Sequence, residues 1–165
     1  MDFMLHFGPS HYTELYHEDD PYFSREGKGN VKAFIDYYKK CYEPTNGKGM
    51  ICMPSGNHDM VRLTHWLDDE EVKIVFAFIL SLPGAPFIYY GDELGMRYLK
   101  DVVSVEGGYI RTGSRSPMQW NAGPNAGFSE AKADELYIPI DPDENRPTAE
   151  GQMADPNSLY HEVKK

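Results

Sequence analysis

The hydrophobic positions of this chain fall into short continuous runs that alternate with stretches of helical spacing. Apolar runs occupy residues 1–7, 49–54 and 85–90, and each is followed by glycine, proline or polar residues. The runs 49–54 and 85–90 have no polar alternation, which suits strands that are covered on both faces, as in parallel sheets. The run 1–7 could be a further strand. Helix-length segments lie between the runs, so the chain predicts the order strand, helix, strand, helix, strand and an α/β fold built from βαβ units.

The first predicted helix covers residues 31–42. Asn30 precedes it and is a residue type that caps helix N-termini. The apolar side chains repeat at the spacing of one buried stripe, and they are Val31, Phe34, Ile35, Tyr38, Cys41 and Tyr42. Pro44 and Gly47 then end the helix before the strand that begins at Gly49.

The second predicted helix follows Asp68 and Asp69, which are both candidates for its N-cap. Glu70 and Glu71 would lie in its first turn, where acidic side chains complement the helix dipole. Residues 72–82 are apolar almost all round, so this helix is expected to be buried on more than one side.

In two segments the hydrophobic positions show neither helical nor strand spacing. Residues 10–29 are polar and aromatic and predict a loop, and residues 97–154 are rich in Gly, Pro, Asn and Asp. So long an irregular segment is typical of a functional excursion. A helix is predicted to start at Asp155-Pro156, and the chain ends at Lys165 without a stop signal. We therefore expect residues 1–165 to be part of a larger barrel or sheet, with sheet edges open to self-association.

Composition narrows the classes of partner. The net charge of −10 and a pI near 5.0 argue against a nucleic-acid partner, because no basic cluster could neutralise phosphates. No run of eighteen apolar residues exists and no signal peptide is visible, so no membrane span is expected and the chain is assigned, weakly, to the cytoplasm. The high aromatic content, 13%, suits a neutral ligand.

Polar residues follow two of the predicted strands directly. Asn57, His58 and Asp59 come after the run 49–54, and Asp92 and Glu93 come after the run 85–90. In parallel α/β folds the side chains that carry chemistry lie just beyond the carboxyl ends of the strands. The functional site is therefore expected at these two positions.

Three segments, SGNHDMVRL, GAPFIYYGDELGM and SRSPMQWN, occur in this order. Together they resemble the α-amylase family of glycoside hydrolases (glycoside hydrolase family 13), in the branch of α-glucosidases, oligo-1,6-glucosidases and trehalose synthases. The resemblance implies the C-terminal portion of a (β/α)8 TIM barrel, strands 6 to 8 with their helices. Residues 1–165 would form a partial catalytic domain, and residues 97–154 would be an irregular excursion between the eighth strand and the eighth helix.

The resemblance also implies retaining cleavage of an α-glucosidic bond through an oxocarbenium-like transition state. Asp59 matches the carboxylate that stabilises this transition state, and His58 matches a histidine that binds the same sugar. Further substrate contacts would come from Asn57, Arg62, Arg115 and Trp120. Ser116 and Asn121 depart from the family pattern, in which Thr and Asp are usual.

No segment matches the family's nucleophile or general acid, so this chain alone is expected to be inactive. The resemblance implies an α-glucan, an oligosaccharide or another α-glucoside as substrate of the parent protein. It implies no cofactor within this chain and allows calcium in the parent.

Each candidate residue also has a structural interpretation. Asp59 could cap a helix, His58 could be an ordinary hydrogen-bonding residue, and Arg62 could reach a nearby carboxylate or carbonyl. Trp120 could pack within its loop, and in the family the Asp92-Glu93 pair shapes the end of a strand.

Two other functional classes compete. The tetrad Gly-Asn-His-Asp also occurs in metallophosphoesterases, but these need an upstream Asp-x-His, which the sequence lacks. The second alternative is a non-catalytic carbohydrate-binding or assembly module, which the aromatic, acidic segment 97–154 would permit.

Overall fold

The computed structural model describes residues 2–5 and 12–165. The chain divides into two compact units. Met1–Ser55 and Trp66–Ile88 form the first, named the sheet unit here, and Gly56–His65 and Tyr89–Lys165 form the second, named the loop unit. The polar residues predicted to form the site all belong to the loop unit.

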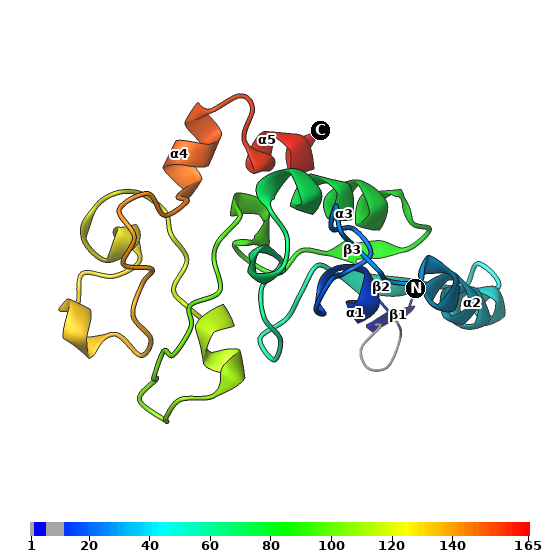
Figure 1. Ribbon diagram of the computed structural model, residues 1–165, viewed down its shortest axis with the longest axis horizontal. Helices are drawn as coiled ribbons and strands as arrows, with labels where there is room; N and C mark the ends of the chain where they lie inside the picture. The colour runs from blue at the N-terminus through cyan, green and yellow to red at the C-terminus, as the bar shows by residue number, and fades with distance from the viewer. Residues whose placement is uncertain (1, 6–11) are drawn as a thin grey trace. The chain divides into compact units, whose positions relative to one another are not determined.

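The sheet unit is built on three parallel strands, β1 (Asp2–Leu5), β2 (Gly49–Pro54) and β3 (Ala85–Phe87), in the order β1-β2-β3 (Figure 1). Leu5 pairs with Cys52, and Cys52 pairs with Ala85 on the other side. The predicted parallel arrangement is thus confirmed within the described residues. The rest of the first predicted strand, residues 1, 6 and 7, lies outside them.

Helix α2 (Val31–Tyr42) has the bounds that its apolar stripe predicts. The Asn30 side chain accepts a hydrogen bond of 2.9 Å from the backbone N–H of Lys32, which caps the helix as expected. Of the stripe predicted to be buried, Phe34 and Tyr38 are buried, whereas Ile35 and Tyr42 are 38% and 39% exposed. Phe34 contacts Phe78 of the next helix with ring centroids 5.4 Å apart, so the two helices of the sheet unit share a small aromatic core.

Helix α3 (Asp69–Ser81) begins after Asp68, which decides between the two predicted caps. The Asp68 carboxylate accepts the Glu71 N–H at 2.9 Å, and the Glu71 carboxylate accepts the Asp68 N–H at 2.8 Å. This reciprocal capping box satisfies two donors that a helix N-terminus otherwise leaves open.

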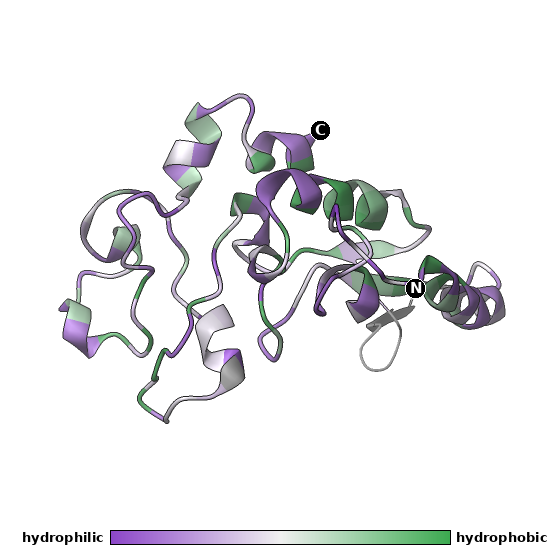
Figure 2. Cartoon of the chain, viewed as in Figure 1, coloured by the Kyte–Doolittle hydropathy of each residue, from purple (hydrophilic) through white to green (hydrophobic). Residues whose placement is uncertain are grey.

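The prediction that α3 is buried on more than one side is wrong for this structure. Val72, Val75 and Ile79 are buried, whereas Ile74 and Leu80 are 50% and 44% exposed. Figure 2 shows the apolar residues that run along this helix. Helical spacing places Ile74 on the side of α3 away from its buried residues and Leu80 at the margin of the buried face. The described part of the chain leaves about half of each side chain exposed.

The last strand is shorter and more exposed than predicted. Apolar residues run from 85 to 90, but β3 ends at Phe87, which is 47% exposed. Just beyond the end of β2, the Ser55 N–H donates a hydrogen bond of 2.8 Å to the carbonyl of Phe87, the last residue of β3. Among the described strands β3 has one neighbour, β2, so its other edge is open, as the sequence predicts for a sheet of three strands.

The segments without sequence period contain short helices. In the sheet unit, α1 (Thr13–Tyr16) corrects the loop predicted for residues 10–29, and η1 (Glu43–Thr45) follows α2. The loop unit contains η2 (Leu63–His65), η3 (Asp92–Leu94), η4 (Ile110–Ser114), η5 (Pro124–Gly127), η6 (Ala133–Glu135), α4 (Ala149–Ala154) and α5 (Leu159–Lys164).

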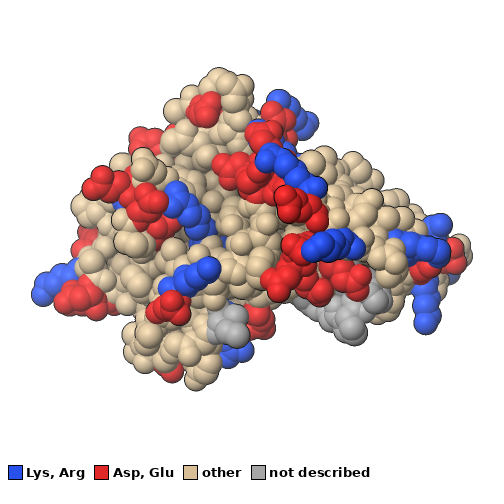
Figure 3. Space-filling model, viewed as in Figure 1, with Lys and Arg blue, Asp and Glu red and all other residues tan. Residues whose placement is uncertain are grey.

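Helix α5 starts later than the sequence predicts. Its N-cap is Ser158, not Asp155, because the Asp155 carboxylate accepts the Asn157 N–H at 2.9 Å and holds residues 155–157 in a turn. On the face seen in Figure 3, acidic and basic side chains are interspersed. None of the helices in the described segments has the length and hydropathy that a membrane crossing requires.

Candidate functional site

The site begins with a tight turn in the loop unit. The Asn57 side-chain oxygen accepts the backbone N–H of Asp59 at 2.8 Å, and its amide group donates to the sulfur of Met60 at 3.3 Å. Such a side-chain-to-backbone bond is the reason that Asn is common in turns. Asn57 therefore shapes the turn that presents Asp59, and its predicted contact with substrate stays a prediction.

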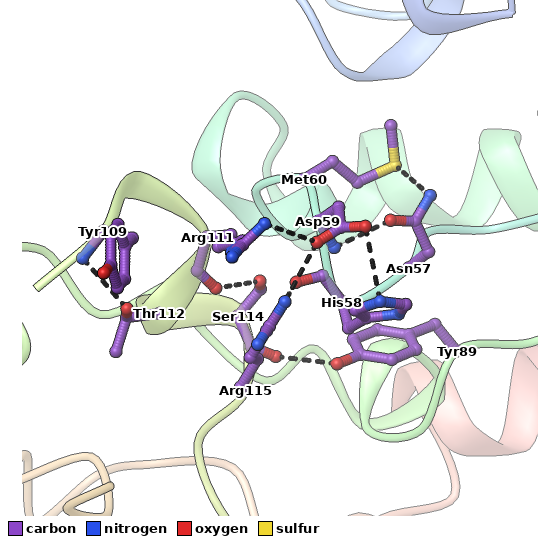
Figure 4. A network of polar contacts seen from close by, with 10 residues as sticks. All are labelled: Asn57, His58, Asp59, Met60, Tyr89, Tyr109, Arg111, Thr112, Ser114 and Arg115. Atoms are coloured by element: carbon purple, nitrogen blue, oxygen red, sulfur yellow. Dashed lines mark hydrogen bonds and ion pairs between the residues drawn. The ribbon is translucent and has the colours of Figure 1, made fainter. Parts of the chain in front are cut away.

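The Asp59 carboxylate is the centre of a polar network (Figure 4). Its Oδ1 atom lies 2.9 Å from Arg115 Nη2 and 3.4 Å from Arg111 Nη1, and its Oδ2 atom lies 3.3 Å from His58 Nε2. The Asp59 side chain is 55% exposed and that of His58 is 65% exposed. The structure therefore joins Asp59, His58 and Arg115, three of the predicted site residues, and leaves the carboxylate within reach of a ligand.

Arg115 holds the turn as well as the carboxylate. Its Nε donates to the His58 carbonyl at 2.8 Å while Nη2 donates to Asp59. Two donors of one planar guanidinium thus fix the backbone and the side chain of the same turn, a geometry that a lysine cannot reproduce. The two contacts place the Arg115 guanidinium beside Asp59. The substrate contact predicted for Arg115 stays a prediction.

Arg111 is a further residue of the site, which the sequence pattern does not predict. It lies in η4, four residues before Arg115, and the chain gives only this spacing as a signal. Within this element the Ser114 hydroxyl donates to the Arg111 carbonyl at 2.7 Å, and the Thr112 hydroxyl accepts the Tyr109 N–H at 3.1 Å. These local bonds hold the two arginines so that both reach one carboxylate (Figure 4).

Gly113 lets η4 approach the neighbouring chain closely. A Cβ atom at this position would lie 1.9 Å from the Leu99 carbonyl oxygen, well inside van der Waals contact. The Leu99 N–H donates to the Gly113 carbonyl at 3.1 Å, so a backbone hydrogen bond holds the two segments together. A glycine between the two arginines is therefore a steric requirement for their placement.

Arg62 corrects one prediction. Its side chain has no exposed surface, and Nη1 donates to Asp92 Oδ1 at 3.0 Å and to the Tyr90 carbonyl at 2.8 Å. The guanidinium carbon also lies 5.0 Å from the Tyr89 ring centroid and 4.9 Å from that of Tyr90. Because this group is buried among protein partners, it cannot bind substrate here, and it ties the segment that carries Asp59 to the segment at residues 89–92.

Tyr89 and Tyr90 connect their own segment with the residues on either side of Arg115. The Tyr89 hydroxyl donates to the Ser114 carbonyl at 3.2 Å, and the Tyr90 hydroxyl donates to the Ser116 carbonyl at 2.7 Å. Burial raises the pKa of the Tyr89 hydroxyl well above its usual value, which keeps it a neutral donor. Tyr89 and Tyr90 thus fix the position of Arg115 through its neighbours.

The Asp92-Glu93 pair has a structural role in this geometry. Asp92 is buried against Arg62, and its N–H donates to the Tyr89 carbonyl at 3.0 Å in the turn that leads into η3. Burial raises the pKa of the Glu93 carboxyl, whose Oε2 atom is buried and has no hydrogen-bond partner among the described residues. These facts agree with the interpretation that the pair shapes the end of the strand.

Trp120 lies in the wall of a cavity in the loop unit and is 51% exposed. The cavity has a volume of about 500 Å³, and Arg115 belongs to the same wall. Its lining consists of Tyr90, Glu93, Arg115, Pro117, Met118, Trp120, Phe128, Leu136, Tyr137 and Ile138. The substrate contact predicted for Trp120 stays a prediction, and the cavity adds a space that the sequence did not reveal.

Among the described residues, no three His, Cys, Asp or Glu side chains converge into a group suited to a metal ion. The chemistry available at Asp59 is that of a solvent-accessible carboxylate, which can accept hydrogen bonds from hydroxyl groups and stabilise nearby positive charge.

The chain resembles known proteins in sequence and in fold. Residues 6–165 match the family described as "Alpha amylase, catalytic domain". The chain is 36% identical over 165 residues to a probable oligo-1,6-glucosidase 3 of Bacillus subtilis, a match that covers 80% of this chain and 29% of that protein. It is 45% identical over 80 residues to the trehalose synthase/amylase TreS of Mycobacterium tuberculosis, covering 47% of this chain and 12% of that protein.

A third relative is the human amino acid transporter heavy chain SLC3A1. This chain is 36% identical to it over 112 residues, a match that covers 66% of this chain and 16% of that protein. Among solved structures, the trehalulose synthase MutB superposes with a TM-score of 0.68 at 20% identity, covering 97% of this chain and 34% of that protein. This likeness supports the fold. The chain spans about a third or less of the length of each of these relatives.

Proposed function

Because the chain belongs to the α-amylase family through its catalytic domain, we propose that it forms part of a retaining glycosidase that acts on α-glucosidic bonds. Asp59 stabilises the positive charge that develops on the reacting glucose ring. His58 and Arg115 bind the same sugar and hold the carboxylate in place. The observation that carries this proposal is the convergence of Arg111, Arg115 and His58 on the half-exposed Asp59 carboxylate.

The arrangement suits a stabilising role better than a nucleophilic one. Asp59 Oδ1 is held by two guanidinium groups, and Oδ2 lies 3.3 Å from His58 Nε2, so both oxygens already have fixed partners. A carboxylate held in this manner still provides a fixed negative potential beside the sugar, and preorganised charge of this kind is a large term in catalysis. A hydroxyl group of the substrate would replace Arg111 as a partner of the Asp59 carboxylate, or would bind between the two side chains.

We place residues 1–165 as strands 6 to 8 of the (β/α)8 barrel, with 97–154 as the excursion after the last strand. The order of the segments SGNHDMVRL, GAPFIYYGDELGM and SRSPMQWN supports this placement. The chain covers 29% of the oligo-1,6-glucosidase, as a part of a barrel would. The nucleophile and the general acid would then lie on strands outside these residues. Residues 1–165 alone are accordingly proposed to be inactive.

The proposal is tested by steady-state hydrolysis of p-nitrophenyl α-glucoside. Residues 1–165 should show no turnover above a buffer control. In a longer protein that includes the remaining barrel strands, Asp59→Asn should lower kcat by about 10³-fold or more, because a neutral amide stabilises the cationic ring poorly. Asp101→Asn, which changes charge outside the Asp59 network, is the matched control. Near-normal turnover by Asp59→Asn would contradict the proposed role.

A second candidate function is a non-catalytic carbohydrate-binding or assembly module. The match to a human amino acid transporter heavy chain favours it, because that relative's name describes a transporter subunit. Calorimetry with maltose and isomaltose discriminates between the two. Tight, saturable binding by residues 1–165, unchanged in Asp59→Asn, would favour the module.

A further inference from the structure

The guanidinium group of Arg97 faces three oxygen atoms of one short segment. Its Nη1 donates to Asp143 Oδ2, and its Nη2 donates to the Asn145 carbonyl at 3.0 Å. Its Nε lies 3.9 Å from Asp141 Oδ2. All four residues belong to the loop unit. Two carboxylate oxygens and one backbone oxygen, all from residues 141–145, therefore surround a single positive charge.

The Asp141 carboxylate is buried with one of its oxygens unsatisfied. The residue is 4% exposed, and its Oδ1 accepts the Asp143 N–H at 3.0 Å. Its Oδ2 is buried and has no hydrogen-bond partner among the described residues, because the 3.9 Å to Arg97 Nε exceeds a hydrogen-bond distance. A buried charge is unfavourable unless a partner compensates it closely. Asp141 Oδ2 therefore points to a cation that comes nearer than Arg97 does.

The spacing of the segment is that of a divalent-cation loop. Asp141, Asp143 and Asn145 fit the pattern D-x-[DN]-x-[DN], which supplies the first three ligand positions of a twelve-residue calcium loop. The chain has Arg146 where that loop has glycine and Gln152 where it has a bidentate glutamate. The segment therefore provides the first half of the ligand set, with two carboxylates and backbone oxygen, and water would complete the coordination.

Arg146 lies on the other side of the same segment. Its Nη1 donates to the carbonyl oxygens of Asp141 and Asp143 at 3.5 Å and 3.1 Å. Within the described residues, Arg97 is the cation that forms ion pairs with both carboxylates. Removing the Arg97 charge would thus leave the two carboxylates without an ion-pair partner and leave Arg146 on the backbone.

The position that Arg97 occupies is open to exchange. The side chains of Arg97 and Asp143 are 41% and 43% exposed, so solvent and dissolved ions reach the ion pair. Exposed ion pairs contribute little to stability, because water screens them and two long side chains must be ordered. An ion of higher charge density could therefore compete with Arg97 for the same oxygens.

We propose that Asp141, Asp143 and Asn145 form a site for a hard divalent cation, calcium in preference to magnesium, and that Arg97 is the internal competitor of this ion. The ion would bind Oδ2 of both aspartates and the Asn145 carbonyl oxygen, and it would release Arg97. Arg97 and Asn145 are 48 residues apart in the sequence, so the two occupants differ in whether these distant segments are joined. The inference is independent of the proposed function, because no glucoside enters the site or the test.

The test is isothermal titration of CaCl2 into calcium-free residues 1–165. Arg97→Met removes the competing charge and should tighten calcium binding by about tenfold or more, because a site that is mostly occupied by a competitor binds with reduced apparent affinity. Lys100→Met is the matched control. It removes one positive charge from the same unit, three residues away, and should leave the calcium affinity at the wild-type value.

Two further variants test the ligands. Asp141→Asn and Asp143→Asn, each combined with Arg97→Met, should abolish the gain in calcium affinity. Asparagine keeps the oxygen that accepts a backbone N–H in this segment, so both variants preserve the turn. Asp143 is 43% exposed, and its variant remains informative even where the buried Asp141 position tolerates no change.

The outcomes that would overturn the inference are distinct. Equal calcium affinities of the wild type and Arg97→Met would show that Arg97 does not occupy the site, and absence of binding by Arg97→Met would show that no site exists. Binding that survives in both double variants would place the ion elsewhere. Titration with MgCl2 should give weaker binding, since Mg²⁺ demands octahedral geometry and loses water reluctantly. Tighter binding of Mg²⁺ would refute the preference for calcium.

Discussion

Arg62 Nη1 lies 3.0 Å from Asp92 Oδ1, and both side chains are shielded from solvent. This buried ion pair joins two segments that are 30 residues apart in the sequence. Removing one partner of a buried pair leaves an uncompensated charge in a medium that solvates it poorly. The pair therefore specifies how the Asp59 turn is placed in the loop unit.

We expect Arg62→Met to lower the free energy of unfolding by about 3–5 kcal/mol, measured by urea denaturation followed by tryptophan fluorescence. Arg111→Met is the matched control, because it removes an arginine from a half-exposed ion pair and should cost less than about 1 kcal/mol. If Arg62→Met lowered the free energy of unfolding by less than about 1 kcal/mol, the structural role of the Arg62–Asp92 ion pair would be contradicted. The double variant Arg62→Met/Asp92→Leu should lose less than the two single losses added together.

The two arginines at Asp59 should differ in their tolerance of lysine. Arg115 makes two bonds with one guanidinium, to the His58 carbonyl and to Asp59, whereas Arg111 makes one longer bond of 3.4 Å. Arg115→Lys should therefore weaken the binding of methyl α-D-glucoside by about fivefold or more, and Arg111→Lys should have a smaller effect. Calorimetry on both variants measures this order, and the reverse order would refute the assignment of Arg115 as the main partner.

Gly113 gives a steric test of the same element. Gly113→Ala places a Cβ atom 1.9 Å from the Leu99 carbonyl oxygen, so η4 must shift and the free energy of unfolding should fall by about 1–3 kcal/mol. Binding of methyl α-D-glucoside should weaken in parallel, because Arg111 and Arg115 move with η4. Gly108→Ala is the control, since its nearest atom, Val103 Cγ2, would lie 3.4 Å away. Equal behaviour of the two alanine variants would disprove the close approach.

The capping box of α3 predicts an effect on stability that is independent of the site. Asp68→Ala removes the acceptor of the Glu71 N–H and should cost about 1 kcal/mol. Asp69→Ala, in the first turn of the same helix, should cost only a few tenths of a kcal/mol through the helix dipole. Urea denaturation of both variants gives the comparison, and a larger loss in Asp69→Ala would place the cap wrongly.

Glu93 predicts a pH dependence. Burial raises the pKa of its carboxyl above the ordinary value of 4.5, so the folded protein binds this proton more tightly than the unfolded chain. The stability that this group contributes is fully present below pH 4.5 and is lost as the pH rises through the raised pKa. Glu93→Gln should remove this loss and become more stable relative to the wild type between pH 5 and pH 8, as thermal denaturation at several pH values would show. A stability difference that does not change with pH would contradict the assignment.

Local sequence determined the positions of helices α2 and α3. The Asn30 cap of α2 and the Asp68 cap of α3 join residues two and three apart in the chain, so the pattern alone predicts them. The parallel order of the strands followed from unbroken apolar runs that were separated by helix-length segments. The position of Asn57, His58 and Asp59 beyond β2 followed in the same manner.

Only the tertiary structure decided which of these polar groups meet. Arg111 and Arg115 reach Asp59 across more than fifty residues, and Arg62 turns inward to Asp92, and no periodicity encodes such pairs. The exposure of Phe87 and Ile74 likewise depends on which neighbours cover them, which a residue's own hydrophobicity does not state. Local spacing fixes hydrogen bonds between close neighbours in the chain, whereas burial and long-range ion pairs depend on how distant segments are brought together.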